Sequence, residues 1–262
     1  MAQTKMQKER TTTIFKDGGR YRLYGDVGII DQLPNKVLDL KLDGFGMPYL
    51  EESQPIQLPK KIYSNDSVFI EHVLKSYNSC TTSLGVLLSG KKGLGKSFTA
   101  NVIISKLELP VIRITSSLSK GTDLFGFLNR IEQEYILFID EFEKIFSSRT
   151  REDNEGKMMS QNDFLSYLDS GSLSNKRMFV ITANEDVSQY LMNRPTRIRY
   201  HRKYDQMHIT TIKEIIDDLL INKEFAEDLV ENVSQKYINI DVLIKIIEEV
   251  NLHNTPYSVF KD

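Results

Sequence analysis

Four short apolar runs, separated by segments with helical periodicity, occupy the middle of the chain. They lie at residues 84–89, 111–115, 135–140 and 178–183, and residues 198–204 are a candidate for a fifth. Each run is apolar on both faces, which is typical of a strand buried in a parallel sheet. A chain of 262 residues is long enough to bury such a core. The alternation therefore predicts an α/β fold, a parallel sheet flanked by helices.

The segments on either side of this core have different patterns. Residues 1–58 read as a small β-rich segment, in which Val37–Leu42 alternates apolar and polar side chains. Residues 205–262 contain only helical stripes and carry 12 Asp or Glu against 5 Lys or Arg, which predicts an acidic, all-helical lid. Between them, residues 59–204 form the predicted α/β core, whose first helix is expected to be capped by Asp66.

The composition restricts the classes of partner and compartment. The 34 Lys and Arg residues are balanced by 36 Asp and Glu, so a basic coat over the whole molecule is excluded, although a local basic patch is not. A single cysteine, Cys80, cannot form an internal disulfide, which fits a reducing cytoplasm. The apolar runs are far shorter than a bilayer requires, and the first ten residues lack the apolar stretch of a secretory signal. We therefore expect a cytoplasmic location and no membrane partner.

Residues 90–97 (GKKGLGKS) match the pattern G-x-x-x-x-G-K-[ST] in full. A glycine-rich loop of this kind turns its backbone N–H groups toward phosphate oxygens, and the positive end of the following helix adds to the attraction. In this chemistry Lys96 reaches the β- and γ-phosphates of a nucleotide, and the Ser97 hydroxyl binds Mg²⁺. The residues expected to bind the nucleotide are Gly90, Lys91, Lys92, Gly93, Leu94, Gly95, Lys96, Ser97 and Phe98.

Acidic and amide side chains follow two of the apolar runs. Asp140 and Glu141 end the third run, and Asn184 ends the fourth. Because parallel α/β sheets bind ligands at the carboxyl ends of their strands, Asp140 is expected to hold Mg²⁺ through its water shell. Glu141 is expected to orient and polarise an attacking water, and Asn184 to hydrogen-bond that water or the γ-phosphate. Each signal alone has a plainer explanation, since solvated acids and Asn are common at strand ends.

A cluster of cations lies near the end of the predicted core. Five fall within ten residues, namely Arg194, Arg197, Arg199, Arg202 and Lys203. A solvated basic loop or a nucleic-acid patch would explain the cluster. The sharper alternative is a pair of arginine fingers, which stabilise the charge that develops on a transferred phosphoryl group.

These motifs, in this order, resemble the AAA+ ATPase family, specifically its ring-forming AAA branch, over residues 63–252. The resemblance implies a P-loop NTPase core with residues 90–97 as Walker A, a Walker B motif that ends at Asp140-Glu141, and Asn184 as the first sensor. Arg194 and Arg197 match the fingers that reach the ATP of the neighbouring subunit. The catalytic residues implied in this way are Glu141, Lys96, Asn184, Arg194 and Arg197.

The resemblance also implies ligands and partners. ATP and Mg²⁺ are the expected nucleotide and metal ion, and the expected assembly is a ring-shaped homo-oligomer, a hexamer. The sequence as a whole looks most like short AAA ATPases of large tailed bacteriophages, which would place the protein in the host cytoplasm. The chain departs from the family at residues 116–121 (SSLSKG), which lack the aromatic–hydrophobic–Gly triplet of members that thread polypeptides. The predicted lid also has no clear second-sensor arginine.

Three functions fit these features. The leading hypothesis is a Mg²⁺-dependent ATPase that remodels or translocates an unidentified protein or nucleic-acid client, which the β-rich N-terminal segment would recognise. A helicase or clamp loader acting on DNA is an alternative, supported only by the cations of residues 194–203. A nucleotide-gated interaction module with little turnover is a third, although an intact Glu141 argues against it.

Overall fold

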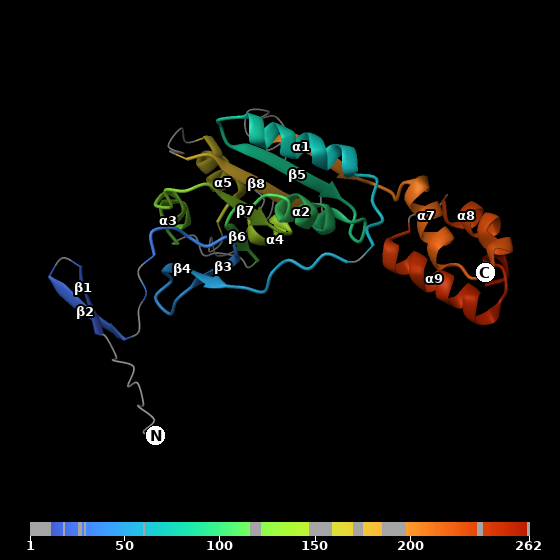
Figure 1. The fold of residues 1–262 in the computed structure, drawn as a ribbon, viewed down its shortest axis with the longest axis horizontal. Helices are drawn as coiled ribbons and strands as arrows, with labels where there is room; N and C mark the ends of the chain where they lie inside the picture. Colours follow the sequence, from blue (N-terminus) through green and yellow to red (C-terminus); the bar gives the residue numbers. More distant parts are fainter. Residues whose placement is uncertain are drawn as a thin grey trace, which may run out of the picture. The chain divides into compact units, whose positions relative to one another are not determined.

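The computed structural model describes residues 12–17, 19–25, 28, 30–59, 61–115, 122–146, 159–169, 175–184, 198–234 and 238–260. The chain divides into two compact units, Met1–Leu33 and Pro34–Asp262, which are considered separately below. Figure 1 shows the described elements of both units, with colours that follow the sequence.

The strands form two sheets. They are β1 (Thr12–Asp17), β2 (Arg20–Gly25), β3 (Val37–Leu42), β4 (Pro48–Glu52), β5 (Leu84–Gly90), β6 (Val111–Ile114), β7 (Tyr135–Ile139), β8 (Arg177–Ala183) and β9 (Ile198–Tyr204). Strands β1 and β2 pair as an antiparallel hairpin in the first unit. The other seven form one sheet in the order β4-β3-β6-β7-β8-β5-β9, in which all neighbours except β3 and β4 run parallel.

Helices follow most of the strands of the large sheet. They are α1 (Ser67–Ser79), α2 (Lys96–Ser105), α3 (Leu124–Asn129), α4 (Phe142–Ile145), α5 (Gln161–Asp169), α7 (Ile209–Leu219), α8 (Ala226–Ser234) and α9 (Ile240–His253), with the 3-10 turns η1 (Lys223–Phe225) and η2 (Tyr257–Phe260). The four apolar runs are therefore β5 to β8, and the candidate fifth strand is β9. The expected α/β fold, a parallel-dominated sheet flanked by helices with further helices at the C-terminal end, is confirmed.

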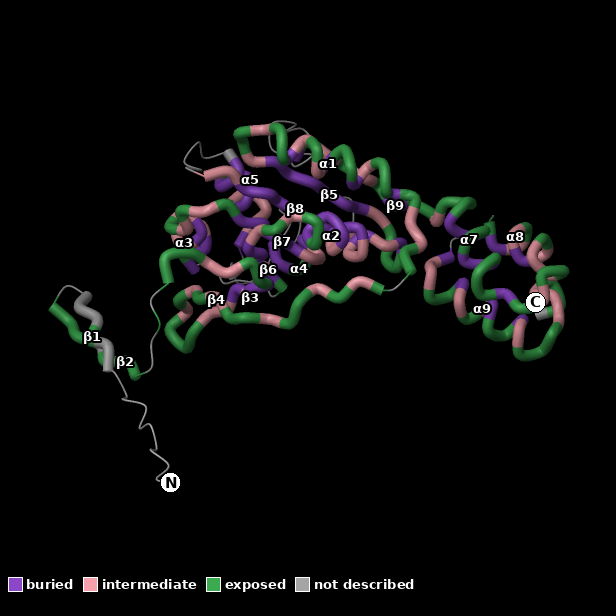
Figure 2. The backbone as a smooth tube through the Cα atoms, viewed as in Figure 1, coloured by how far each residue is buried: buried purple, intermediate pink, exposed green. Residues whose placement is uncertain are grey.

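Helices cover both faces of the large sheet, whose central strands are buried throughout (Figure 2). Met178 and Val180 of β8 pack in one cluster with the buried residues of α1 and α2. Phe179 lies between them in the strand and contacts the ring of Tyr167 on α5. Because successive side chains of a strand point to opposite faces, α1 and α2 cover one face and α5 the other.

Strands β3 and β4 belong to the large sheet, a difference from the predicted β-rich segment of residues 1–58. Strand β3 runs parallel to β6, with Val37 opposite Val111, and Arg113 donates two hydrogen bonds to Asp39, of 2.7 and 3.1 Å. Among the described strands, β1 and β2 alone form a separate sheet. The alternation in β3 identifies a strand, but its partner lies far along the chain, and such pairing leaves no local signal.

The C-terminal helices have a core of their own. Ten buried residues from α7, α8, α9 and the turn before α9 form one apolar cluster, and in this part of the chain the structure describes only helices, turns and loops. Every helix among the described residues is too short or too polar to cross a bilayer.

The position of β3 in the main core leads to a stability prediction. Leu40 is 1% exposed, so Leu40→Ala should lower the free energy of unfolding by about 2–5 kcal/mol, as expected when a buried leucine is truncated. Leu23→Ala on β2 removes the same atoms from a side chain that is 66% exposed and should change it by less than about 0.5 kcal/mol. Urea unfolding followed by circular dichroism compares the two variants, and equal losses would contradict the assignment of β3 to the core.

Candidate functional site at the carboxyl edge of the sheet

The glycine-rich loop lies between β5 and α2 and depends on its glycines. Gly90, Gly93 and Gly95 have φ angles of +121°, +77° and +92°, a region that side chains disfavour. A Cβ atom on Gly90 would lie 2.2 Å from the carbonyl oxygen of Tyr204. That same oxygen accepts a 2.8 Å hydrogen bond from the N–H of Lys91. The loop is therefore fastened to the end of the neighbouring strand β9, and only glycine permits the close approach.

Lys96 begins α2 and is buried, with 5% of its surface exposed. Its ammonium donates hydrogen bonds to the carbonyl oxygens of Gly90 (2.8 Å) and Lys91 (2.7 Å), inside the curve of the loop. Burial lowers the pKa of Lys96, and the nearby carboxylates of Glu143, Asp140 and Glu141 oppose this effect. A phosphate group would offer the ammonium charged acceptors, which make stronger hydrogen bonds than carbonyls.

Asp140 joins three segments at the carboxyl edge of the sheet. It follows β7, and its Oδ1 accepts a 2.9 Å hydrogen bond from Ser97 at the start of α2 and a 2.6 Å hydrogen bond from Thr182 of β8. A hydroxyl beside a carboxylate suits Mg²⁺, which prefers oxygen ligands and usually combines one or two carboxylates with phosphate oxygens and water. The described residues contain no cluster of three or more His, Cys, Asp or Glu side chains suited to a metal ion. A Mg²⁺ ion held here would therefore take its other ligands from phosphate and water.

Glu141 is held in place by side chains from two directions. Its backbone has a φ of 58°, unusual for a residue with a side chain, and its N–H donates a 2.9 Å hydrogen bond to Thr182. Asn184 donates a 2.9 Å hydrogen bond to Oε1, and Lys144 donates a hydrogen bond to Oε2. The bond from Lys144 contributes most to keeping the pKa of Glu141 below its usual value. Glu141 is therefore an ionised carboxylate in a fixed orientation.

Asn184 connects Glu141 to a second carboxylate. Its amide donates a 3.0 Å hydrogen bond to Glu143, and its backbone N–H lies 3.2 Å from both oxygens of the same residue. Glu143 is thus a side chain of this site that the sequence patterns did not identify, as are Thr182 and Lys144. All three lie within three residues of a predicted site residue, but the motif does not mark their positions.

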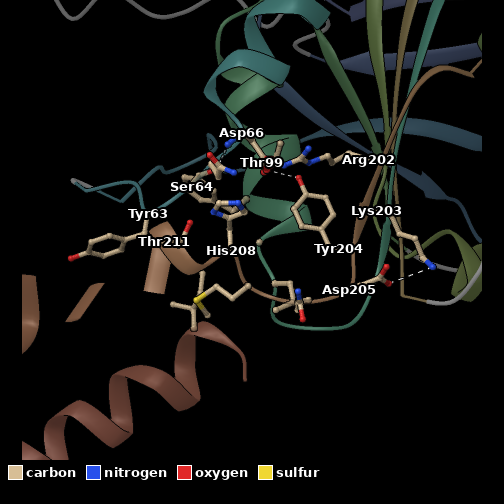
Figure 3. Close-up of a pocket in the computed structure, with 17 residues that line it drawn as sticks. Tyr63, Ser64, Asp66, Thr99, Arg202, Lys203, Tyr204, Asp205, His208 and Thr211 are labelled. Carbon is tan, nitrogen blue, oxygen red and sulfur yellow. Dashed lines mark hydrogen bonds and ion pairs between the residues drawn. The ribbon is translucent and has the colours of Figure 1, made fainter. Parts of the chain in front are cut away.

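A cavity of about 280 Å³ adjoins the glycine-rich loop (Figure 3). Leu94, Gly95 and Phe98, all predicted to bind the nucleotide, line it together with residues 63–66, residues 202–208 and Ile240 at the start of α9. Its walls therefore come from the segment before α1, from the end of β9 and from the C-terminal helices. The cavity is thus open space directly beside the glycine-rich loop.

One wall of this cavity is organised by Asp66, which was predicted to cap α1. It does precede the helix, but its side chain makes no capping hydrogen bond. Asp66 is 4% exposed, and its carboxylate accepts hydrogen bonds from the hydroxyls of Thr99 (2.8 Å) and Tyr204 (2.6 Å). The guanidinium of Arg202 lies 3.0 Å from the same carboxylate and supplies the opposite charge. Figure 3 shows these side chains converging from α2 and β9. The capping prediction is wrong because a buried carboxylate takes the stronger, charge-paired contacts.

The structure brings together Lys96, Ser97, Asp140, Glu141 and Asn184, which follow the adjacent strands β7, β8 and β5. Arg194 and Arg197 lie outside the described residues, as do residues 116–121. The remaining cations of the cluster, Arg199, Arg202 and Lys203, lie on β9.

Comparison with known proteins shows what this part of the chain is similar to. Residues 86–205 match the family model "ATPase family associated with various cellular activities (AAA)". This stretch of the chain is therefore similar to an AAA ATPase domain. The similarity supports the expectation of an enzyme that hydrolyses ATP.

Individual proteins match parts of the chain. Fidgetin-like protein 1 of Drosophila melanogaster is 29% identical over 129 residues, 45% of this chain and 24% of that protein. The Holliday junction branch migration complex subunit RuvB of Salinibacter ruber is 36% identical over 90 residues, 34% of this chain and 25% of that protein. The RuvB of Flavobacterium johnsoniae is 41% identical over 61 residues, 22% and 18% of the two chains. The matches thus span about a quarter or less of these relatives.

Solved structures agree with the fold. Two variants of Thermotoga maritima RuvB superpose with a TM-score of 0.50 each, at 20% and 19% sequence identity. They cover 71% and 74% of this chain, and 60% and 66% of the RuvB chains. At this identity the likeness concerns the fold alone.

The position of Lys96 predicts its contribution to nucleotide binding. Lys96→Ala removes the one buried ammonium that the described loop holds, so ATP affinity should fall by at least about tenfold, the equivalent of one charge-assisted hydrogen bond. Lys106→Ala, at the exposed C-terminal end of the same helix, should leave the affinity unchanged. Isothermal titration calorimetry measures both. Undiminished affinity in a folded Lys96→Ala variant would rule out the assignment of the loop.

Proposed function

We propose that this protein is a Mg²⁺-dependent AAA+ ATPase that works as a ring-shaped homo-oligomer, a hexamer, and remodels or translocates a macromolecular client. The observation that carries the proposal is the set of contacts among Lys96, Ser97, Asp140, Glu141 and Asn184 beside a cavity of nucleoside size. These are the groups that phosphoryl transfer to water requires: a phosphate cradle, a metal-binding pair, a base and a polar residue that orients it.

In this proposal each side chain has one task. The backbone of the glycine-rich loop and Lys96 would bind the β- and γ-phosphates. Ser97 and Asp140 would hold Mg²⁺, which would supply positive charge next to the phosphates. Glu141 accepts a hydrogen bond from the attacking water and polarises it. Each carboxylate oxygen has two lone pairs, so Glu141 can do so while Asn184 keeps it oriented. Phe98 and the walls of the cavity hold the nucleoside.

In this proposal, the ring brings positive charge from one subunit to the phosphates bound by the next. Arg194 and Arg197 are proposed as fingers that reach the ATP of the neighbouring subunit and act on charge developing during phosphoryl transfer. Support for the ring comes from the AAA domain and from the two-arginine spacing. The proposal also includes a resemblance to short AAA ATPases of large tailed bacteriophages and a cytoplasmic location. Both rest on the sequence alone.

A DNA loader or motor is the second candidate. Its support is the match to RuvB, whose name assigns it to Holliday junction branch migration, together with the cations of β9.

A module that binds ATP with little turnover is the third candidate. The fixed, ionised Glu141 argues against it, because a switch without hydrolysis has little need of a base.

The role of Glu141 can be separated from binding. Glu141→Gln keeps the shape of the side chain and its bond from Asn184 but loses the charge, so ATP should still bind while turnover falls by roughly 10²-fold or more. Glu132→Gln, at an exposed position between α3 and β7, is the matched control and should have no effect. Phosphate release and calorimetry measure the two quantities, and near-normal turnover in Glu141→Gln would require another base.

The finger proposal makes a prediction for mixed subunits. Arginine fingers are worth on the order of 10³–10⁵ in rate, so Arg197→Ala should bind ATP yet be nearly inactive. Mixing it with Lys96→Ala should restore part of the activity, because a Lys96→Ala subunit can supply its arginines to the intact phosphate site of its neighbour. Turnover per wild-type subunit should also rise with protein concentration. Flat specific activity from nanomolar to micromolar protein, with no complementation, would defeat the ring mechanism.

A further inference from the structure

Asn184 is held by two carboxylates at a point where the pairing of its strand has ended. Strand β8 ends at Ala183, and the last pair of its ladder with β5 is Ser89 opposite Ala183. The backbone N–H of Asn184 lies beyond that pair, 3.2 Å from both carboxylate oxygens of Glu143. The side-chain nitrogen donates to Oε1 of Glu143 (3.0 Å) and to Oε1 of Glu141 (2.9 Å). Glu143 thus binds Asn184 through its main chain and its side chain together.

These contacts determine which atom of the Asn184 side chain is left for a ligand. An asparagine amide has two hydrogens on its nitrogen and one acceptor oxygen. Both hydrogens are used here, one by Glu141 and one by Glu143. A carboxylate only accepts hydrogen bonds, so turning the amide over would place its oxygen against negative charge. The carbonyl oxygen Oδ1 is therefore the atom that Asn184 can offer to a water molecule.

The backbone that carries Glu143 is anchored in the core. Glu143 belongs to α4, in which Phe142 and Ile145 are completely buried. The ring of Phe142 packs edge-on against that of Phe164 on α5, with 5.3 Å between the ring centroids. The buried pair fixes the position from which Glu143 reaches Asn184, as a group that orients a catalytic side chain requires.

We propose that Glu143 is a positioning residue of the ATPase, which orients the Asn184 amide so that its carbonyl oxygen and Glu141 accept the two hydrogens of the attacking water. The inference rests on the proposed function. It assigns a task that the motifs leave open, since they allow Asn184 to contact either the water or the γ-phosphate. With both amide hydrogens engaged, these contacts favour the water.

A water held by two acceptors has its orientation fixed. Its hydrogens point to Asn184 and Glu141, so a lone pair of its oxygen is free to face the phosphate. The oxygen then bonds to the γ-phosphorus as the bond to the leaving ADP breaks, and Glu141 takes one of the two protons. Without Glu143 the amide of Asn184 would lose its second acceptor and could turn away from the water.

A second role for Glu143 has to be separated from this one. Burial lowers the pKa of Lys96, and Glu143 is the first of the three carboxylates whose charge opposes that effect. Through its charge Glu143 would act on nucleotide binding rather than on Asn184. Glu143→Gln distinguishes the two roles. It removes the charge but keeps one acceptor oxygen, and Oε1 of Glu143 alone accepts both N–H groups of Asn184.

The test measures kcat by phosphate release and ATP affinity by calorimetry, both in the full-length chain. Glu143→Ala should lower kcat by at least about tenfold, because a misplaced group at a reacting centre is costly, while ATP affinity should not fall. Glu143→Gln should keep kcat close to the wild-type value. Glu132→Ala removes a carboxylate from an exposed position between α3 and β7 and should change neither quantity.

A double-mutant cycle shows whether Glu143 acts through Asn184. In an Asn184→Ala background, Glu143→Ala should lower kcat no further, because the amide that Glu143 orients is gone. Four results would each overturn the proposal: additive losses in the cycle, wild-type kcat in Glu143→Ala, equal losses in the Ala and Gln variants, or reduced ATP affinity at unchanged kcat.

A spectroscopic readout separates this inference from the proposed function. In protein made with isotope-labelled asparagine, Asn184→Ala identifies the side-chain amide signal of Asn184 in the NMR spectrum by its loss. Both amide protons should resonate downfield in the nucleotide-free wild type, and Glu143→Ala should move one of them upfield. This pattern in a wild-type protein that hydrolyses no ATP would refute the proposed function and leave the orientation of Asn184 standing. Unmoved protons in Glu143→Ala, with normal wild-type turnover, would refute the inference alone.

Discussion

The rest of the site depends on the hydrogen bonds that Asp140 accepts. One of its oxygens accepts hydrogen bonds from Ser97 after β5 and from Thr182 of β8, while the residue itself follows β7. Thr182 in turn accepts the backbone N–H of Glu141 and so helps to hold its positive φ. Three parallel strands that are distant in sequence are thus fixed at one edge, and the groups that would bind phosphate, metal and water lie within hydrogen-bonding reach of one another.

The same edge is tied to the C-terminal helices through the cavity. Tyr204 ends β9, accepts the N–H of Lys91 with its carbonyl and donates its hydroxyl to Asp66. Gly93 of the loop lies against Asn239, which caps α9. A nucleotide in this position would touch the phosphate loop, the segment before α1 and the start of α9 together. In the proposed function, binding and release of ATP would therefore influence the position of the C-terminal helices.

Much of this site could be predicted because short sequence motifs mark its residues. The pattern of residues 90–97 marks the loop directly. The polar residues after β7 and β8 could be placed beside it because the carboxyl ends of parallel strands lie at one edge of a sheet. The contribution of β3 to the large sheet was missed because its pairing with β6 is long-range. Asp66 was misread because a residue before a helix has the same local signature whether it caps the helix or, as here, pairs with distant Arg202. Thr182, Glu143 and Lys144 gained their roles only from the packing of neighbouring strands.

The central claim is that the glycine-rich loop, the Asp140 edge and the adjoining cavity form one ATP site. A structure determined with a non-hydrolysable ATP analogue and Mg²⁺ tests it most directly. The account predicts that the triphosphate lies in the curve of residues 90–97, that the Lys96 ammonium leaves the carbonyls of Gly90 and Lys91 for the phosphates, and that the base enters the cavity beside Asp66. A nucleotide bound elsewhere, with Lys96 still on the loop carbonyls, would contradict it.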